Sequence, residues 1–94
     1  MRLSSAEIDL LKNQLRVLSY DAKIYLFGSR VDDTKRGGDI DLLVVSNKLT
    51  KKELRLLRVE YFKKFGEQKM DIILDDGNFL KPFNKLVFKE AILL

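Results

Sequence analysis

The feature that most restricts the fold of this chain is a nearly continuous apolar run at residues 40–45, Ile-Asp-Leu-Leu-Val-Val. A run of this kind predicts a strand that is covered on both faces. Residues 23–27 are β-branched and aromatic and stop at Gly28, which predicts a second strand. Residues 70–74 predict a third, closed by the turn sequence Asp-Asp-Gly-Asn at 75–78.

Three amphipathic segments predict the helices. Ser4 and Glu7 have the spacing of a capping box, and apolar residues then recur at helical spacing over residues 5–19. Thr50 precedes a second such segment, which Gly66 ends. Pro82 stands near the start of a final helix. With a short helical turn after the first strand, this order predicts an α/β (α+β) fold.

The length of 94 residues fits one small domain, and 46% of the residues are hydrophobic, which is typical of a globular chain. We therefore expect a single domain over residues 1–94. A core of this size gains stability when one more face is buried, against a partner or a second copy of the chain.

The chain has neither cysteine nor histidine. This excludes disulfides, thiolate metal ligands and thiol nucleophiles, together with the usual general base and the commonest zinc ligand. Any catalysis must therefore depend on carboxylates, lysines, hydroxyls and a bound metal ion.

The net charge of +4 is compatible with a nucleotide, a nucleic acid or an acidic protein as partner, and also with an ordinary solvated surface. The N-terminus does not resemble a signal peptide, and no apolar run approaches the roughly 20 residues needed to span a bilayer. We therefore expect a cytoplasmic protein without a membrane partner.

Three carboxylates are placed as metal ligands would be. Side chains two apart on a strand share a face, so Asp39 and Asp41 are expected on one face, about 7 Å apart along the backbone. Asp71, which opens the third strand, would bring a third carboxylate to the same edge. Close carboxylates repel each other unless a cation lies between them, and hard oxygen ligands suit Mg²⁺. The pattern predicts a clamp of one or two Mg²⁺ ions for in-line phosphoryl chemistry.

Gly28 and Ser29 predict the other half of such a site. Glycine allows a phosphate to approach the backbone, and a helix that begins just after Ser29 would direct free amides at an anion. Arg30, with Lys35 or Arg36, would balance the charge of a triphosphate.

Each of these motifs also has a structural interpretation when it is taken alone. Gly-Ser after a strand is often only a strand end and a cap, and Asp-x-Asp before an apolar run is often a solvated strand start. The other aspartates in turn-like segments are interpreted as loop residues; these are Asp32, Asp33, Asp75 and Asp76.

Together, the motifs are far more specific. The order of Gly28-Ser29, a loop, Asp39-x-Asp41 in an apolar strand and Asp71 at the next strand resembles the nucleotidyltransferase superfamily that includes DNA polymerase beta. The likeness is closest to its minimal, MNT-type members and covers essentially the whole chain.

This resemblance implies the nucleotidyltransferase fold, with a mixed β-sheet flanked by helices. It implies that Gly28 and Ser29 hold the β- and γ-phosphates of ATP or another nucleoside triphosphate, with Arg30 beside them. It also implies that Asp39 and Asp41 bind two Mg²⁺ ions. Asp71 would complete the metal site and help to activate an acceptor hydroxyl.

Minimal members of the superfamily are commonly paired with a HEPN-domain toxin, which they restrain by transferring AMP onto it. The resemblance therefore implies an antitoxin with a HEPN-domain partner. Two alternatives stay open: a binding module that blocks the toxin without turnover, and nucleotidyl transfer to RNA or a small molecule. Residues 48–64 are rich in lysine and arginine and would offer nucleic acid a basic helix.

The C-terminal helix is expected to carry the docking surface for a protein acceptor. If this helix runs to the end of the chain, residues 88 and 92 fall outside its main apolar face and lie one turn apart. Phe88 and Ile92 are then expected to be an exposed apolar pair. The alternative is a helix that is covered on both sides by its own domain or by a second copy.

Overall fold

The computed structural model describes residues 3–32 and 38–94 of the chain. The elements follow in the order α1 (Ser5–Leu18), β1 (Lys23–Phe27), η1 (Gly28–Val31), β2 (Ile40–Val45), α2 (Lys51–Phe65), β3 (Met70–Asp75), α3 (Pro82–Phe88) and β4 (Ile92–Leu93). The three strands and three helices expected from the sequence are confirmed, and β4 is an additional strand.

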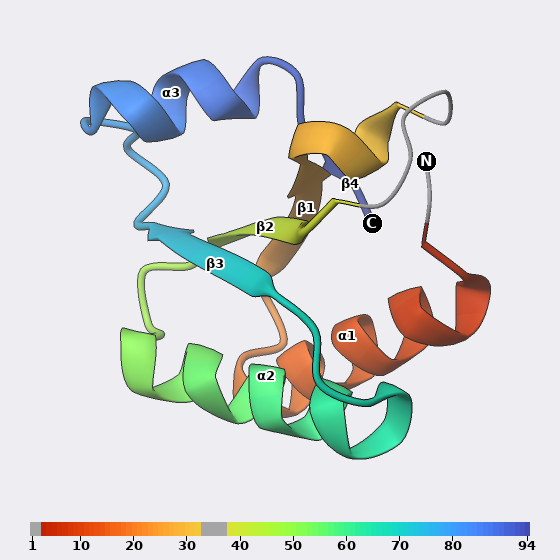
Figure 1. Ribbon diagram of the computed structural model, residues 1–94. Helices are drawn as coiled ribbons and strands as arrows, with labels where there is room; N and C mark the ends of the chain where they lie inside the picture. Colours follow the sequence, from red (N-terminus) through yellow and green to blue (C-terminus); the bar gives the residue numbers. More distant parts are fainter. Residues whose placement is uncertain (1–2, 33–37) are drawn as a thin grey trace.

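The sheet is mixed, with strand order β3-β2-β1-β4. Strands β2 and β3 are parallel, whereas β1 is antiparallel to both β2 and β4. Helices α1 and α2 lie side by side on one side of this sheet, and α3 lies on the other side (Figure 1). The α+β architecture with a mixed sheet flanked by helices is therefore confirmed.

The apolar run of β2 is buried on both faces, as its sequence predicts. Ile40, Leu42 and Val44 belong to the main core beneath the sheet, where they pack with residues of α1 and α2. Because side chains alternate along a strand, Leu43 faces the α3 side, and it too is fully buried. Asp41, between Ile40 and Leu42, shares the α3 side with Leu43.

The predicted caps fix the starts of the first two helices. The backbone amide of Glu7 donates to the Ser4 hydroxyl, and the amide of Ser4 donates to Glu7 Oε1 at 3.0 Å. At α2 the amide of Thr50 donates to Glu53 Oε2 at 2.9 Å. Each cap satisfies a backbone amide that has no partner inside its helix. No helix in the described ranges combines the length and apolar character needed to cross a membrane.

The expectation of a C-terminal helix that runs to the end of the chain is wrong. Helix α3 ends at Phe88, and Ile92 and Leu93 form β4, which pairs with β1. The ring of Phe88 packs edge-on against Tyr25, with ring centroids 5.2 Å apart. Helical spacing therefore does not apply between residues 88 and 92. Both side chains are nevertheless exposed, at 39% and 36%, and a role for them in docking a partner stays a prediction. A two-residue strand carries no periodicity from which it could be predicted.

Candidate active site

The turn after β1 brings a glycine to the edge of the sheet. Gly28 opens the short helix η1 and has φ of +79°, a left-handed conformation that glycine adopts without a steric penalty. A Cβ atom at this position would overlap Oδ2 of Asp41 and stand 3.1 Å from its Cγ. The backbone of the Gly28 turn and the Asp41 carboxylate are therefore in direct contact.

The register of the sheet places two of the three predicted carboxylates next to each other. Asp41 of β2 pairs with Phe27 on one side and with Asp71 of β3 on the other. Because the two strands are parallel, Asp41 and Asp71 project to the same face at the same level. Burial raises the pKa of Asp41, and the neighbouring Asp71 and Asp39 raise it further, partly offset by Lys69. A cation at this edge would relieve that unfavourable negative charge.

Asp39, the third predicted ligand, lies directly before β2. Its Oδ2 is 3.4 Å from Nζ of Lys69; the Lys69 side chain is largely open to solvent and that of Asp39 is partly exposed. Among the described residues, no group of three or more acidic side chains is arranged to hold a metal ion. The donor set itself suits Mg²⁺, since carboxylate oxygens are the ligands that this ion prefers. The assignment of all three aspartates as ligands stays a prediction.

Of the cationic residues predicted to bind the triphosphate, the structure describes only Arg30. Arg30 extends across the site edge, where its Nε donates to the carbonyl oxygen of Gly38 at 3.4 Å and its Nη2 donates to Gln68 Oε1 at 3.1 Å. Its role in binding nucleotide stays a prediction. Lys35 and Arg36 lie outside the described residues.

A protein-family model described as the nucleotidyltransferase domain matches residues 8–93, which include every predicted site residue. The chain belongs to this nucleotidyltransferase family. The match supports the polymerase beta-like superfamily, whose members typically use a nucleoside triphosphate and Mg²⁺. A search of curated proteins found no match. Nucleotidyl transfer, the general activity expected from the motif order, is thereby supported.

Two neighbouring hollows meet at Gly28 of the nucleotidyltransferase. One, of about 420 Å³, is lined by Gly28, Ser29, Val31, Asp32 and Glu90. The other, of about 360 Å³, lies between Phe27 and Gly28 on one side and the α3 residues Phe83, Leu86 and Val87 on the other, with Glu90 at its rim. Glu90 was not predicted as a site residue, because the sequence places it inside a continuous helix. It lies instead in the turn between α3 and β4.

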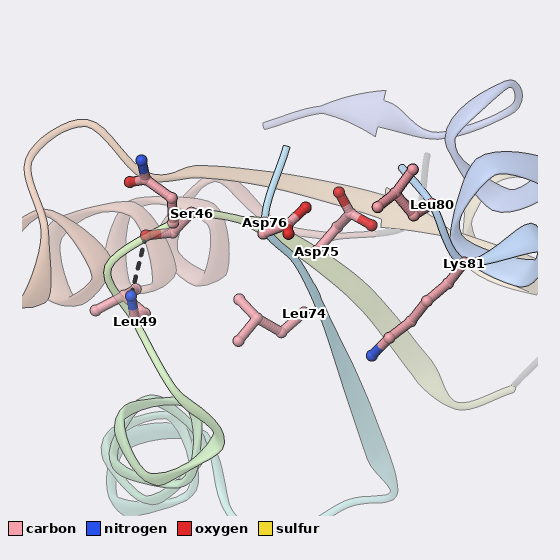
Figure 2. Close-up of a pocket in the computed structure, with 8 residues that line it drawn as sticks. Ser46, Leu49, Leu74, Asp75, Asp76, Leu80 and Lys81 are labelled. Atoms are coloured by element: carbon pink, nitrogen blue, oxygen red, sulfur yellow. Dashed lines mark hydrogen bonds between the residues drawn. The ribbon is translucent and has the colours of Figure 1, made fainter. Parts of the chain in front are cut away.

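A further cavity, of about 350 Å³, lies where β2 and β3 end (Figure 2). This is the opposite end of the two strands from Asp41 and Asp71. Asp75 is one of its lining residues. The interpretation of Asp75 as a solvated loop residue is wrong, because Asp75 is the last residue of β3 and is only 4% exposed. Its carboxylate accepts hydrogen bonds from the amides of Gly77 and Phe79 and from Asn84 Nδ2, at 2.8, 3.1 and 3.0 Å. These bonds hold the connection between β3 and α3.

The basic segment at 48–64 lies mostly in α2, across the sheet from Asp41 and Asp71. Helix α2 buries Leu54, Leu57 and Tyr61 beneath the sheet and exposes all of its basic side chains except Arg58, which is half-buried. Ile40, Leu42 and Ile72 face this core, so the alternating Asp41 and Asp71 project from the other side of the sheet. Helix α3 lies on that side (Figure 1). The exposed basic residues of α2 are Lys51, Lys52, Arg55, Lys63 and Lys64.

Proposed function

We propose that this nucleotidyltransferase transfers AMP, or another nucleoside monophosphate, from a nucleoside triphosphate to a hydroxyl group of a HEPN-type toxin, and so acts as its antitoxin. The observation that carries nucleotide transfer is the contact between the Gly28 turn and the Asp41 carboxylate, which pairs with Asp71. A backbone turn that can approach phosphate thereby adjoins paired carboxylates.

Asp39, Asp41 and Asp71 would hold Mg²⁺. When bound, Mg²⁺ would offset the negative charge of the phosphates and stabilise the charge that develops during transfer. The Gly28-Ser29 turn would orient the β- and γ-phosphates beside these carboxylates. The acceptor oxygen forms a bond to the α-phosphorus, and the bond from the α-phosphorus to the oxygen that bridges to the β-phosphate breaks. Pyrophosphate leaves, and the hydroxyl proton passes to the Asp71 carboxylate.

A protein acceptor is supported by the surface beside the Gly28 turn. Phe83 and Leu86 of α3 are 59% and 65% exposed, although both line the hollow that adjoins Gly28. Exposed apolar side chains of this size favour contact with another protein. The basic side chains of α2 lie across the sheet from the aspartates, which disfavours an RNA acceptor bound along that helix. The identity of the acceptor as a HEPN-type toxin comes from the resemblance to minimal family members.

Thermal unfolding tests the metal-dependent site. ATP with Mg²⁺ should raise the melting temperature of the wild-type protein, whereas ATP in EDTA should have little effect, because the carboxylates alone repel the phosphates. The Asp41→Asn variant should lose most of this increase in melting temperature. Equal stabilisation by ATP in EDTA and in Mg²⁺ would contradict a metal-dependent site.

Transfer itself is tested by mass spectrometry of a HEPN-domain protein, the acceptor that this proposal requires. Incubation with ATP and Mg²⁺ should add the mass of AMP to that protein, and Asp41→Asn should abolish the addition. A companion that forms the complex but stays unmodified would favour the non-catalytic binding module. Labelling of RNA instead would favour the nucleic-acid alternative.

A further inference from the structure

A chain of side-chain hydrogen bonds runs from α1 to the edge of the candidate active site. Tyr61 of α2 donates its hydroxyl proton to Glu7 Oε2, and Gln68 Nε2 donates to the Tyr61 oxygen at 2.6 Å. The other end of the same amide, Gln68 Oε1, accepts from Arg30 Nη2 at 3.1 Å. Arg30 then reaches the Gly38 carbonyl through its Nε.

This chain joins three segments that are far apart in the sequence. Arg30 belongs to η1 and follows Gly28 and Ser29 directly. Gly38 precedes Asp39, and Gln68 stands three residues before Asp71. One guanidinium therefore links the proposed phosphate turn to the segments that lead into the carboxylates.

The far end of the chain is fixed in the core. Tyr61 is fully buried, and its ring packs on Phe65 with centroids 5.0 Å apart. Glu7 is also the reciprocal member of the α1 capping box. Both anchors belong to helices that pack against each other beneath the sheet.

The protonation states of these groups fix the orientation of the Gln68 amide. Burial and the hydrogen bond to Glu7 raise the pKa of Tyr61 well above its ordinary value, so its hydroxyl stays protonated at neutral pH. Burial opposes ionisation of Glu7, but hydrogen bonds from Tyr61 and Ser4 outweigh it and lower the pKa of Glu7. Glu7 is therefore an acceptor, and the Tyr61 oxygen accepts from the Gln68 NH₂ group. Only the carbonyl end of Gln68 is left to face Arg30, which can donate but cannot accept.

We infer that Gln68 is a positioning residue: through Arg30 it fixes the Gly28-Ser29 turn relative to the carboxylates of Asp39 and Asp41. This inference rests on the proposed function, since it says how the proposed site is held in register. Neither Gln68 nor Tyr61 needs to touch the nucleotide. A small displacement of the turn would separate the phosphates from the carboxylates and slow transfer strongly.

The first experiment is hydrogen exchange on the protein without nucleotide, so that it does not depend on any activity. Gln68→Leu should speed exchange of the η1 amides about tenfold or more, because it removes both bonds of the amide. Tyr61→Phe keeps the buried ring and should produce a smaller change. Glu67→Leu, at the exposed neighbouring position, is the matched control and should exchange like wild type. Unchanged exchange of η1 in Gln68→Leu would overturn the inference.

The second experiment separates positioning from phosphate binding. Gln68→Leu should lower kcat about tenfold with less than a twofold change in the KM for the triphosphate. Arg30→Met combined with Gln68→Leu should be no worse than Arg30→Met alone, because both changes break one link. Additive effects of the two substitutions on kcat would overturn the inference that Gln68 acts through Arg30. If the wild-type protein transfers no nucleotide, the proposed function fails, and the exchange experiment still decides the role of Gln68.

Discussion

At the scale of single residues, two independent features require glycine at position 28: its backbone conformation and the closeness of Asp41. Its φ of +79° disfavours any side chain, and Asp41 occupies the space that a Cβ atom would need. Gly66, after α2, has φ of +87° with nothing within 4 Å of a Cβ at that position. Substitutions at the two glycines can therefore be compared: both strain the backbone, but only a side chain at position 28 displaces the Asp41 carboxylate.

We predict that Gly28→Ala and Gly66→Ala each lower the free energy of unfolding by about 1–3 kcal/mol, the cost of a strained backbone conformation. Only Gly28→Ala should also abolish stabilisation by ATP with Mg²⁺, because it displaces Asp41. Urea unfolding measures the first effect, and thermal unfolding with ATP measures the second. Normal nucleotide binding by Gly28→Ala would show that the turn and Asp41 do not form one site.

Asp41 illustrates a residue whose charge is unfavourable for folding. Burial and the neighbouring Asp71 and Asp39 raise its pKa, so its ionised form destabilises the fold at neutral pH in the absence of metal. Asp41→Asn should therefore raise the free energy of unfolding in EDTA by roughly 0.2–1 kcal/mol, the range for a partly exposed charge interaction. A raised pKa gives stability that is present below the ordinary pKa and is lost as pH rises through the raised value. The gain from Asp41→Asn should therefore shrink as the pH falls through the raised pKa and vanish below the ordinary value of about 4. Strong destabilisation by Asp41→Asn in urea unfolding would instead place this residue in the folding core.

At the scale of elements, the connection between β3 and α3 depends on Asp75. Burial opposes its charge, but hydrogen bonds from Asn84 and from the amides of Gly77 and Phe79 outweigh burial and lower the pKa of Asp75. Asp75→Asn should cost about 1–3 kcal/mol in the free energy of unfolding at pH 7, because it leaves buried groups without a matching partner. A lowered pKa gives stability that is present above the ordinary pKa and is lost as pH falls through the lowered value. The difference between wild type and variant should therefore narrow below about pH 4, as urea unfolding at several pH values would show. The neighbouring Asp76→Asn is the control, since Asp76 is exposed.

At the scale of the whole molecule, the two sides of the sheet are covered unequally. Helices α1 and α2 cover one side with 14 and 15 residues, whereas α3 contributes seven residues to the other (Figure 1). The large exposed apolar side chains of α3 lie on this less covered side, beside the Gly28 turn. An acceptor protein that binds there would meet the candidate active site directly.

If the proposed HEPN-type acceptor binds there, Phe83→Asp should abolish its co-purification and reduce its modification at least tenfold, while ATP with Mg²⁺ still stabilises the variant. Val17→Asp is the matched control, because Val17 is 82% exposed on α1, which lies across the sheet. Co-purification measured by affinity capture decides between the two surfaces. Loss of the complex in Val17→Asp and not in Phe83→Asp would place the acceptor on the wrong side of the sheet for this proposal.

The sequence by itself determined three of the four strands, the two long helices and the positions of the candidate ligands. The caps at Ser4 and Thr50, the apolar run of β2 and the end of β1 at Gly28 act over a few residues, so local pattern is enough to predict them. The expectation that Asp71 would reach the edge of Asp41 also holds, because parallel β2 and β3 begin at the same edge of the sheet. The catalytic roles of these aspartates stay predictions.

Only the tertiary structure decided how distant segments meet. The short strand β4 exists because β1 offers it an edge, and its two residues carry no pattern of their own. Asp75 resembles a solvated turn residue until Asn84 and two backbone amides surround its carboxylate. Arg30 and Gln68 are 38 residues apart, and nothing local to either predicts their hydrogen bond. Local patterns fix backbone conformation, whereas contacts between distant side chains depend on how the finished sheet and helices pack together.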